Sequence, residues 1–276
     1  MPSAMPSLSP LPALLQPLRV RRLGSASLAR LSRASGTTGR VHSVFERAIN
    51  VLWGDGRLVT LHGPGPLAAP FAVALHRLPA RGTVRPGMAI GRESLDWREA
   101  DCVPLEMPRG PLGFGTHALP ERAGGLRAGG AARAQQALAA SIAAGDARAF
   151  ADAAYALIGS GEGLTPAGDD CVVGALAAIH RLAPGWLASR ANPRGRLADA
   201  AWSRTTAVAR EFLLEALDGR FAEPVLALLT SRSDDLARDA GRRLLAMGAT
   251  SGADTLRGIR LACRALQARV ATRRPA

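Results

Sequence analysis

The chain has 276 residues, of which 47% are apolar and only 4% aromatic, and its formal net charge at pH 7 is +13. This length fits one large domain or two modest ones, and a core built mainly from Ala, Leu and Val favours close-packed helices. No uncharged apolar run reaches the eighteen residues of a membrane-spanning helix, so we expect no membrane partner. The charge suggests nucleic acid, but the basic residues are Arg gathered toward the ends without interleaved aromatic residues. We therefore expect no nucleic-acid partner.

The three cysteines, Cys102, Cys171 and Cys263, are odd in number and far apart. This spacing argues against a disulfide framework or a structural zinc site and is compatible with a reducing compartment. We therefore expect a cytoplasmic protein.

Residues 1–40 are rich in Arg, Ser and Pro, and prolines interrupt any apolar segment of a secretory signal. We interpret them as a disordered extension.

Residues 41–120 carry the signals of strands and turns. The segments 51–53 and 57–61 flank Gly54-Asp55-Gly56, which indicates a hairpin because Asp and Gly tolerate the backbone angles of a tight turn. The apolar run 71–75, bounded by prolines, fits a buried strand, and residues 84–88 form a turn before a strand at 89–90. We expect a small β-rich domain here, either a sandwich or an open barrel.

The second half has the composition of helices. After a Gly-rich linker at 121–130, a helix is predicted over 131–144, and Asp146 is placed to cap another that reaches Ile158. Further helices are predicted over 169–182, 197–217, 223–229, 234–247 and 253–271. We therefore predict an α+β protein whose α-helical domain covers residues 131–276.

The segment 159–170, G-S-G-E-G-L-T-P-A-G-D-D, carries the strongest functional signal. Its glycines permit several backbone N–H groups to converge on one anion, and the chain then enters a helix, whose start favours phosphate or carboxylate. The Lys of a nucleotide-binding P-loop is absent, since the chain contains no Lys. We predict an anion-binding loop that includes Gly159, Gly161, Gly163, Thr165 and Gly168.

Asp169 and Asp170 follow this loop directly. Adjacent carboxylates can share Mg²⁺ that bridges to substrate oxygens, or one can act as a base while the other orients it. We therefore take both as candidate catalytic residues and as possible magnesium ligands. The structural alternative is that they only cap the helix, with the glycines marking a tight turn between helices.

Two further polar clusters interrupt the helical pattern. Arg204, Thr205 and Thr206 lie within a predicted helix, where paired Thr is a poor choice unless the hydroxyls are used. A second Gly- and hydroxyl-rich helix entry contains Thr250, Ser251, Gly252 and Asp254. If both clusters converge on the loop, they form a composite pocket for a small anion, which Arg204 or Arg257 can grip in bidentate fashion. The structural alternative for each cluster is helix capping.

The glycine–aspartate string, together with Thr205-Thr206 and the segment 248–258, resembles the AllH family, named for a subunit of bacterial oxamate carbamoyltransferase. The resemblance covers most of the chain from about residue 40. It implies the conversion of oxalurate and phosphate to oxamate and carbamoyl phosphate in allantoin-type purine catabolism, with two partner subunits. All these substrates and products are small anions, which suits the predicted loop. A non-catalytic assembly subunit, in which the glycine loop only packs, is the alternative.

Overall fold

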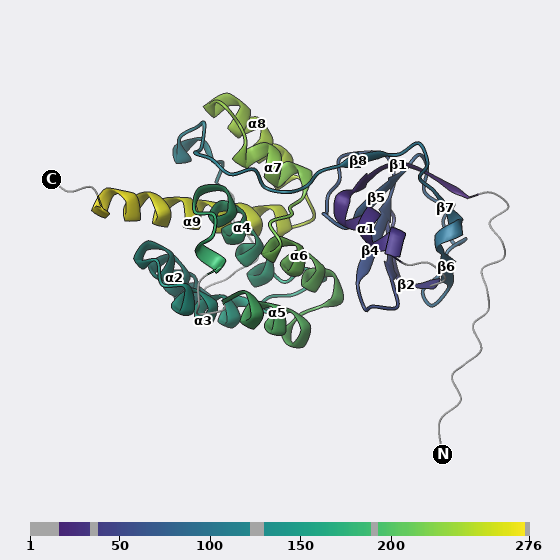
Figure 1. The fold of residues 1–276 in the computed structure, drawn as a ribbon, viewed down its shortest axis with the longest axis horizontal. Coiled ribbons are helices and arrows are strands. Elements are labelled where there is room, and N and C mark those ends of the chain that lie inside the picture. The colour runs from purple at the N-terminus through teal and green to yellow at the C-terminus, as the bar shows by residue number, and fades with distance from the viewer. Residues whose placement is uncertain (1–16, 34–37, 122–129, 189–192, 274–276) are drawn as a thin grey trace, which may run out of the picture. The chain divides into compact units, whose positions relative to one another are not determined.

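The computed structural model describes residues 17–33, 38–121, 130–188 and 193–273. The chain is an α+β protein that divides into two compact units after Pro104, one built on a β-sheet and one helical (Figure 1).

The first unit is a nearly closed mixed sheet in the order β6-β2-β3-β4-β5-β1-β7, with β8 paired to β1. Its elements are β1 (Leu18–Gly24), α1 (Ser25–Arg33), β2 (Thr38–Val44), β3 (Ala48–Leu52), β4 (Leu58–His62), β5 (Ala72–Leu75), β6 (Ala89–Gly91), η1 (Arg92–Ser94), β7 (Leu95–Asp96) and β8 (Asp101–Val103). The β-rich prediction for this half, in its open-barrel form, is therefore confirmed.

The predicted hairpin joins β3 to β4 and is held by local hydrogen bonds. Asp55 Oδ1 accepts from the Arg57 backbone N–H at 2.9 Å, and Gly56 has a φ of 75°. The apolar run before Leu75 forms β5, whose four residues are all buried between its neighbours β4 and β1. Turn chemistry and hydrophobicity therefore located this part of the sheet correctly.

Residues 17–33 correct the expectation of a disordered extension. β1 pairs with β5, β7 and β8, and α1 places Leu31 in the core of the sheet unit, where it is fully buried. In β1 two arginines separate the buried Val20 from the buried Leu23, and the pairing register with β5 shifts between Val20 and Arg22. The arginines of this segment therefore belong to a half-buried strand. Residues 1–16, which belong to the same predicted extension, lie outside the described residues.

The second unit contains η2 (Thr116–Ala118), α2 (Gly130–Ala144), α3 (Ala147–Leu157), α4 (Ala167–Leu182), η3 (Trp186–Ala188), α5 (Pro193–Arg204), α6 (Ala207–Leu217), α7 (Glu223–Leu229), α8 (Asp234–Leu245) and α9 (Ser251–Arg273) (Figure 1). Asp146 caps α3 as predicted, because its side chain accepts from the N–H groups of Arg148 and Ala149. Residues 122–129, which make up most of the predicted Gly-rich linker, lie outside the described part of the chain.

The boundary between the units differs from the predicted one at residue 120. Residues 105–120 belong to the helical unit: Leu105 accepts a hydrogen bond from Phe221 N–H at 2.8 Å, and Met107 donates to Gly219 at 2.7 Å. This segment has the Gly and Pro content of the first half, but its backbone partners are far along the chain, so local composition misplaced it.

The helix predicted over 197–217 is two helices, α5 and α6, separated at Thr205-Thr206. Thr206 has an extended backbone, and its hydroxyl accepts from Ala209 N–H at 3.1 Å, which makes it the N-cap of α6. The correction has a simple cause, since a Thr hydroxyl competes with the helical hydrogen-bond pattern and favours a helix start.

Helix α4 lies at the centre of the helical unit, with every residue from Ala167 to Ile179 buried. Two glycines permit its close crossing with α9. A Cβ at Gly174 would collide with the Thr255 carbonyl, and a Cβ at Gly258 would collide with the Cys171 carbonyl. The starts of α4 and α9 are two of the three places where the sequence predicted functional residues.

Candidate functional site

The glycine loop connects α3 to α4 and has the backbone geometry that its glycines predict. Gly159, Gly161 and Gly163 have φ values of 79°, 118° and 90°, a region that other residues rarely adopt. Packing also requires two of them, because a Cβ at Gly159 would overlap the Arg204 carbonyl and one at Gly161 would lie 2.7 Å from the Ala167 nitrogen.

The first amides of α4 are already bonded within the loop. Gly168 N–H donates to the Ser160 carbonyl at 2.8 Å, while Asp169 and Asp170 donate to the Pro166 carbonyl at 3.0 and 3.2 Å. The backbone N–H groups of residues 161–164, in contrast, donate no hydrogen bond within the described part of the chain, and these four residues are exposed. The open amides are therefore those of the loop, whereas the prediction emphasised the helix start.

Asp169 is buried, with 1% of its surface exposed, and it anchors the loop. Its Oδ2 accepts from Gly159 N–H at 3.0 Å, so the carboxylate serves the loop and no side-chain cap of α4 is formed. Burial raises the pKa of Asp169 to about 6, against the opposing effects of the Gly159 N–H and the Thr205 hydroxyl. Its Oδ1 and the Thr205 hydroxyl oxygen are buried without a partner in hydrogen-bonding geometry.

Asp170 is 6% exposed and lies next to the start of α9. Burial raises its pKa well above the usual range, and the charges of Asp254 and Asp169 raise it further, while the hydroxyls of Ser251 and Thr165 lower it. Its Oδ2 is buried without a hydrogen-bond partner. This environment therefore holds the proton of the carboxyl group more tightly than water does.

Helix α9 begins beside the loop. The Ser251 hydroxyl lies 2.7 Å from that of Thr165, and Asp254, four residues into the helix, is fully buried. Asp254 N–H donates to the carbonyl of Thr250, which is exposed, while Gly252 packs so closely that a Cβ would overlap the Leu244 carbonyl. Ser251 and Asp254 thus join the Asp170 cluster, whereas Thr250 and Gly252 shape the turn.

The Arg204–Thr206 segment reaches the loop from the opposite side. Thr206 donates to the Leu164 carbonyl, and the Arg204 carbonyl packs against Gly159. The Arg204 guanidinium lies 4.4 Å from the ring centroid of Tyr155, the only Tyr in the sequence. The three polar clusters predicted from the sequence therefore converge in space, and Tyr155 is a member that the sequence analysis missed.

Arg257, the other predicted anion-binding arginine, has a different position. It lines a cavity between α2 and α9 that no sequence pattern indicated. The two buried cysteines, Cys171 on α4 and Cys263 on α9, are poorly suited to act as nucleophiles near the site. Burial raises the pKa of both thiols to about 12.

The described residues hold neither a metal-binding cluster nor a membrane-spanning helix. They contain no group of three or more His, Cys, Asp or Glu side chains arranged to hold a metal ion. Nor does any helix among them have the length and apolar character needed to cross a membrane.

The fold and the site define a class: a two-unit α+β protein with a glycine loop placed over buried carboxyl groups and hydroxyls. A family model described as oxamate carbamoyltransferase subunit AllH matches residues 157–263, and a model of the AllH family N-terminal domain matches residues 19–99. The chain belongs to the AllH family, and the matches support a role as a subunit of that enzyme. No solved structure matches the chain.

Proposed function

We propose that this chain is the subunit of an oxamate carbamoyltransferase that holds phosphate, or the phosphate of carbamoyl phosphate, at its glycine loop. The observation that carries the proposal is the exposed row of unbonded amides at residues 161–164, directly beside the buried carboxyl and hydroxyl groups. Successive backbone N–H groups in a glycine-rich turn make a concave site for anions. Three segments, the glycine loop and the starts of α6 and α9, meet there and together form the proposed site.

The anion contacts come from uncharged donors and one cation. The loop amides bind phosphate oxygens, and one hydroxyl of the Thr165–Ser251 pair donates to the same group while the other donates to its partner hydroxyl. Arg204 is exposed at the edge of the loop, where its guanidinium takes a further phosphate oxygen or the carboxylate of oxalurate. Thr206 holds the loop against α6 through its bond to the Leu164 carbonyl.

The buried aspartates supply proton transfer. A phosphate oxygen attacks the ureido carbonyl carbon of oxalurate, and the bond from this carbon to the oxamate nitrogen breaks. Phosphate loses one proton, and the oxamate nitrogen gains one. Asp169, with a pKa of about 6, is suited to accept the phosphate proton at neutral pH, and Asp170, with its raised pKa, is suited to give its own proton to the nitrogen. Transfer of the accepted proton from Asp169 to Asp170 then restores both groups.

The same two carboxyl groups are also candidate ligands of Mg²⁺. Asp169 Oδ1 and Asp170 Oδ2 are oxygen donors without hydrogen-bond partners, which fits a hard cation. Since the described residues offer no cluster of three ligands, substrate oxygens and water must complete the coordination. Magnesium therefore enters the proposal only as an ion that binds together with substrate.

A non-catalytic assembly subunit is the competing function. Its supporting observation is the close packing of Gly159, Gly161 and Gly168, each of which a larger residue would disrupt for purely structural reasons. In that case the loop sets the shape of the helical unit, and the partner subunits carry the chemistry.

The deciding experiment changes the carboxylates without changing their shape. Asp169→Asn with Asp170→Asn, reconstituted with the partner subunits, is expected to assemble normally and to lose at least about a hundredfold in carbamoyl-transfer rate. Thr230→Val, which removes a hydroxyl bonded to the Leu226 carbonyl, is the matched control. Full activity of the assembled double variant would support the assembly function.

Phosphate binding is tested separately by calorimetry of the isolated chain. Thr165→Val with Ser251→Ala is expected to weaken the binding of inorganic phosphate about tenfold, since two hydroxyl donors are removed. Adding magnesium with phosphate tests the role of the carboxyl groups as Mg²⁺ ligands, which predicts tighter phosphate binding in the wild type but not in the aspartate double variant.

A further inference from the structure

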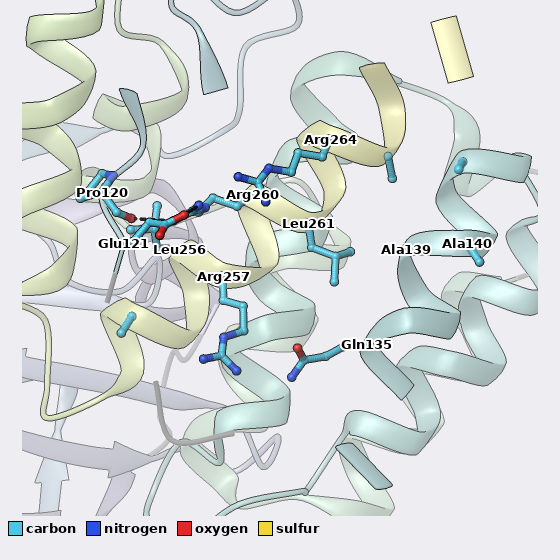
Figure 2. A pocket seen from close by; sticks show the side chains of 13 residues that line it. Pro120, Glu121, Gln135, Ala139, Ala140, Leu256, Arg257, Arg260, Leu261 and Arg264 are labelled. Carbon is cyan, nitrogen blue, oxygen red and sulfur yellow. Dashed lines mark hydrogen bonds and ion pairs between the residues drawn. The ribbon is translucent and has the colours of Figure 1, made fainter. Parts of the chain in front are cut away.

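The helical unit contains a cavity of about 920 Å³ between α2 and α9. Figure 2 shows its two helical walls, with Gln135 on α2 and three arginines on α9, and Pro120 and Glu121 beside them. Its volume lies in the range of roughly 300–1000 Å³ typical of pockets that enclose a drug-sized ligand. The carboxyl cluster of the glycine loop contributes no lining residue, so the cavity is a separate feature.

One wall of the cavity is basic. Arg257, Arg260 and Arg264 are three and four residues apart, so they share one face of α9 and extend over about 10 Å of its length. Arg260 is bonded to Glu121 and donates to the Pro120 carbonyl at 3.2 Å. Among the described lining residues, three arginines stand against one acidic side chain, that of Glu121.

Apart from Gln135, the other described lining residues have apolar side chains. Ala139, Ala140 and Ala143 form the α2 side, while Leu256 and Leu261 contribute from α9. Small side chains on α2 leave space for a ligand body, and Gln135 is the polar side chain that α2 contributes to the described lining. A bare inorganic anion would leave most of this apolar surface in contact with water.

We propose that the α2–α9 cavity binds an amphiphilic anion: a molecule with an apolar body and two negative groups, either phosphates or carboxylates. The apolar body lies against the alanines of α2, and the negative groups contact Arg257 and Arg264. Arg260 fixes Glu121 at the edge of the cavity. This site is independent of the phosphate site at the glycine loop and remains if that proposal fails.

Calorimetry of the full chain at physiological salt with three probes tests the ligand class. ADP presents two phosphates on a nucleoside, azelate presents two carboxylates on an apolar chain, and pyrophosphate has charge without an apolar body. We expect ADP or azelate to bind at one site with a dissociation constant below about 1 mM, at least tenfold tighter than pyrophosphate. ADP alone identifies a phosphorylated ligand, and azelate alone identifies a dicarboxylate.

Variants locate the binding. Arg257→Gln with Arg264→Gln removes the two charges, and Ala140→Trp fills the cavity from the exposed side of α2. Each is expected to weaken the bound probe at least about tenfold. Arg238→Gln, which removes an exposed arginine paired with Asp235 on α8, is the control and should leave binding unchanged. Circular dichroism confirms that each variant is folded.

The proposal is overturned if neither amphiphilic probe binds more tightly than pyrophosphate, or if binding is unchanged in both cavity variants. The aspartate double variant of the glycine loop should bind the probe like the wild type. A loss there would instead place the probe at the loop.

Discussion

The sheet unit and the helical unit differ in what they bury. In the described part of the sheet unit the buried polar residues are Ser27 and Asn50, both uncharged. The helical unit buries five carboxyl groups, those of Asp169, Asp170, Glu211, Glu215 and Asp254. Burying ionisable groups is costly unless they are paired, so this concentration of carboxyl groups is the feature on which the proposed site rests.

The buried carboxyl groups themselves fall into two kinds. Glu215 is paired with Arg220, and Glu211 lies 3.8 Å from Arg210, as expected for structural charges. Asp169 and Asp170 each retain a buried oxygen without a hydrogen-bond partner. Four of the five buried carboxyl groups thus divide into two paired with arginine and two that keep an oxygen without a hydrogen-bond partner, and the second pair is the one in the proposed site.

The largest effect is expected where helices cross. Gly258→Ala should lower the free energy of unfolding by about 3 kcal/mol, because the new Cβ collides with the Cys171 carbonyl in a rigid crossing. Urea unfolding measures the loss. Gly54→Ala in the sheet unit is the control, since nothing lies within 4 Å of its Cβ position, and a similar loss there would contradict the packing argument.

The next effect concerns pH. Asp169 has a folded pKa of about 6 against an ordinary value of 3.8, so the folded state holds the proton more tightly and stability falls as pH rises through this interval. Asp169→Asn keeps an acceptor for Gly159 but does not titrate. The variant's free energy of unfolding relative to wild type should rise by about 2 kcal/mol between pH 4.5 and 8. Urea unfolding at both pH values checks this; an unchanged difference would refute it.

The sheet unit offers a smaller test of the same comparison. Thr60 donates to Asn50 at 2.7 Å, and Asn50 donates to Ser43 at 3.0 Å. Thr60→Val leaves the buried amide oxygen of Asn50 without this donor, and should cost about 1–2 kcal/mol in thermal unfolding. Thr38→Val, at an exposed position of β2, should change stability by less than this.

The smallest expected effect is at the start of α6. Thr206→Ala removes the N-cap and should destabilise the helical unit by about 1 kcal/mol, measured by urea unfolding. Thr206→Ser retains a capping hydroxyl and should recover most of the loss. If Ser and Ala behave alike, the hydroxyl does not stabilise the helix break.

The sequence predicted elements whose causes are local. Gly54-Asp55-Gly56 and the Asp146 cap follow from turn and capping chemistry within a few residues. Strand β1 was missed because it pairs with β5, β7 and β8, all distant along the chain. The break at Thr205-Thr206 was masked by helix-forming residues on both sides, so an uninterrupted helix was predicted.

The glycine loop shows the same limit at the site. The positive φ values of its glycines could be predicted, since other residues rarely adopt these angles. The sequence could not predict that the carbonyls of Ser160 and Pro166 accept from the first N–H groups of α4, because these bonds depend on how the loop folds back. The cavity between α2 and α9 also escaped prediction, since its walls come from segments more than a hundred residues apart.

The close crossing of α4 and α9 at Gly174 and Gly258 fixes the relative position of the two helix starts. Both helices start at the polar cluster, and Gly174 and Gly258 lie only a turn or two beyond Asp170 and Asp254. A larger residue at either glycine would push the helices apart at the crossing. It would thereby shift their starts, where the Thr165 and Ser251 hydroxyls lie 2.7 Å apart. The two glycines lie outside the polar cluster, yet their packing sets the distance between the helix starts that form it.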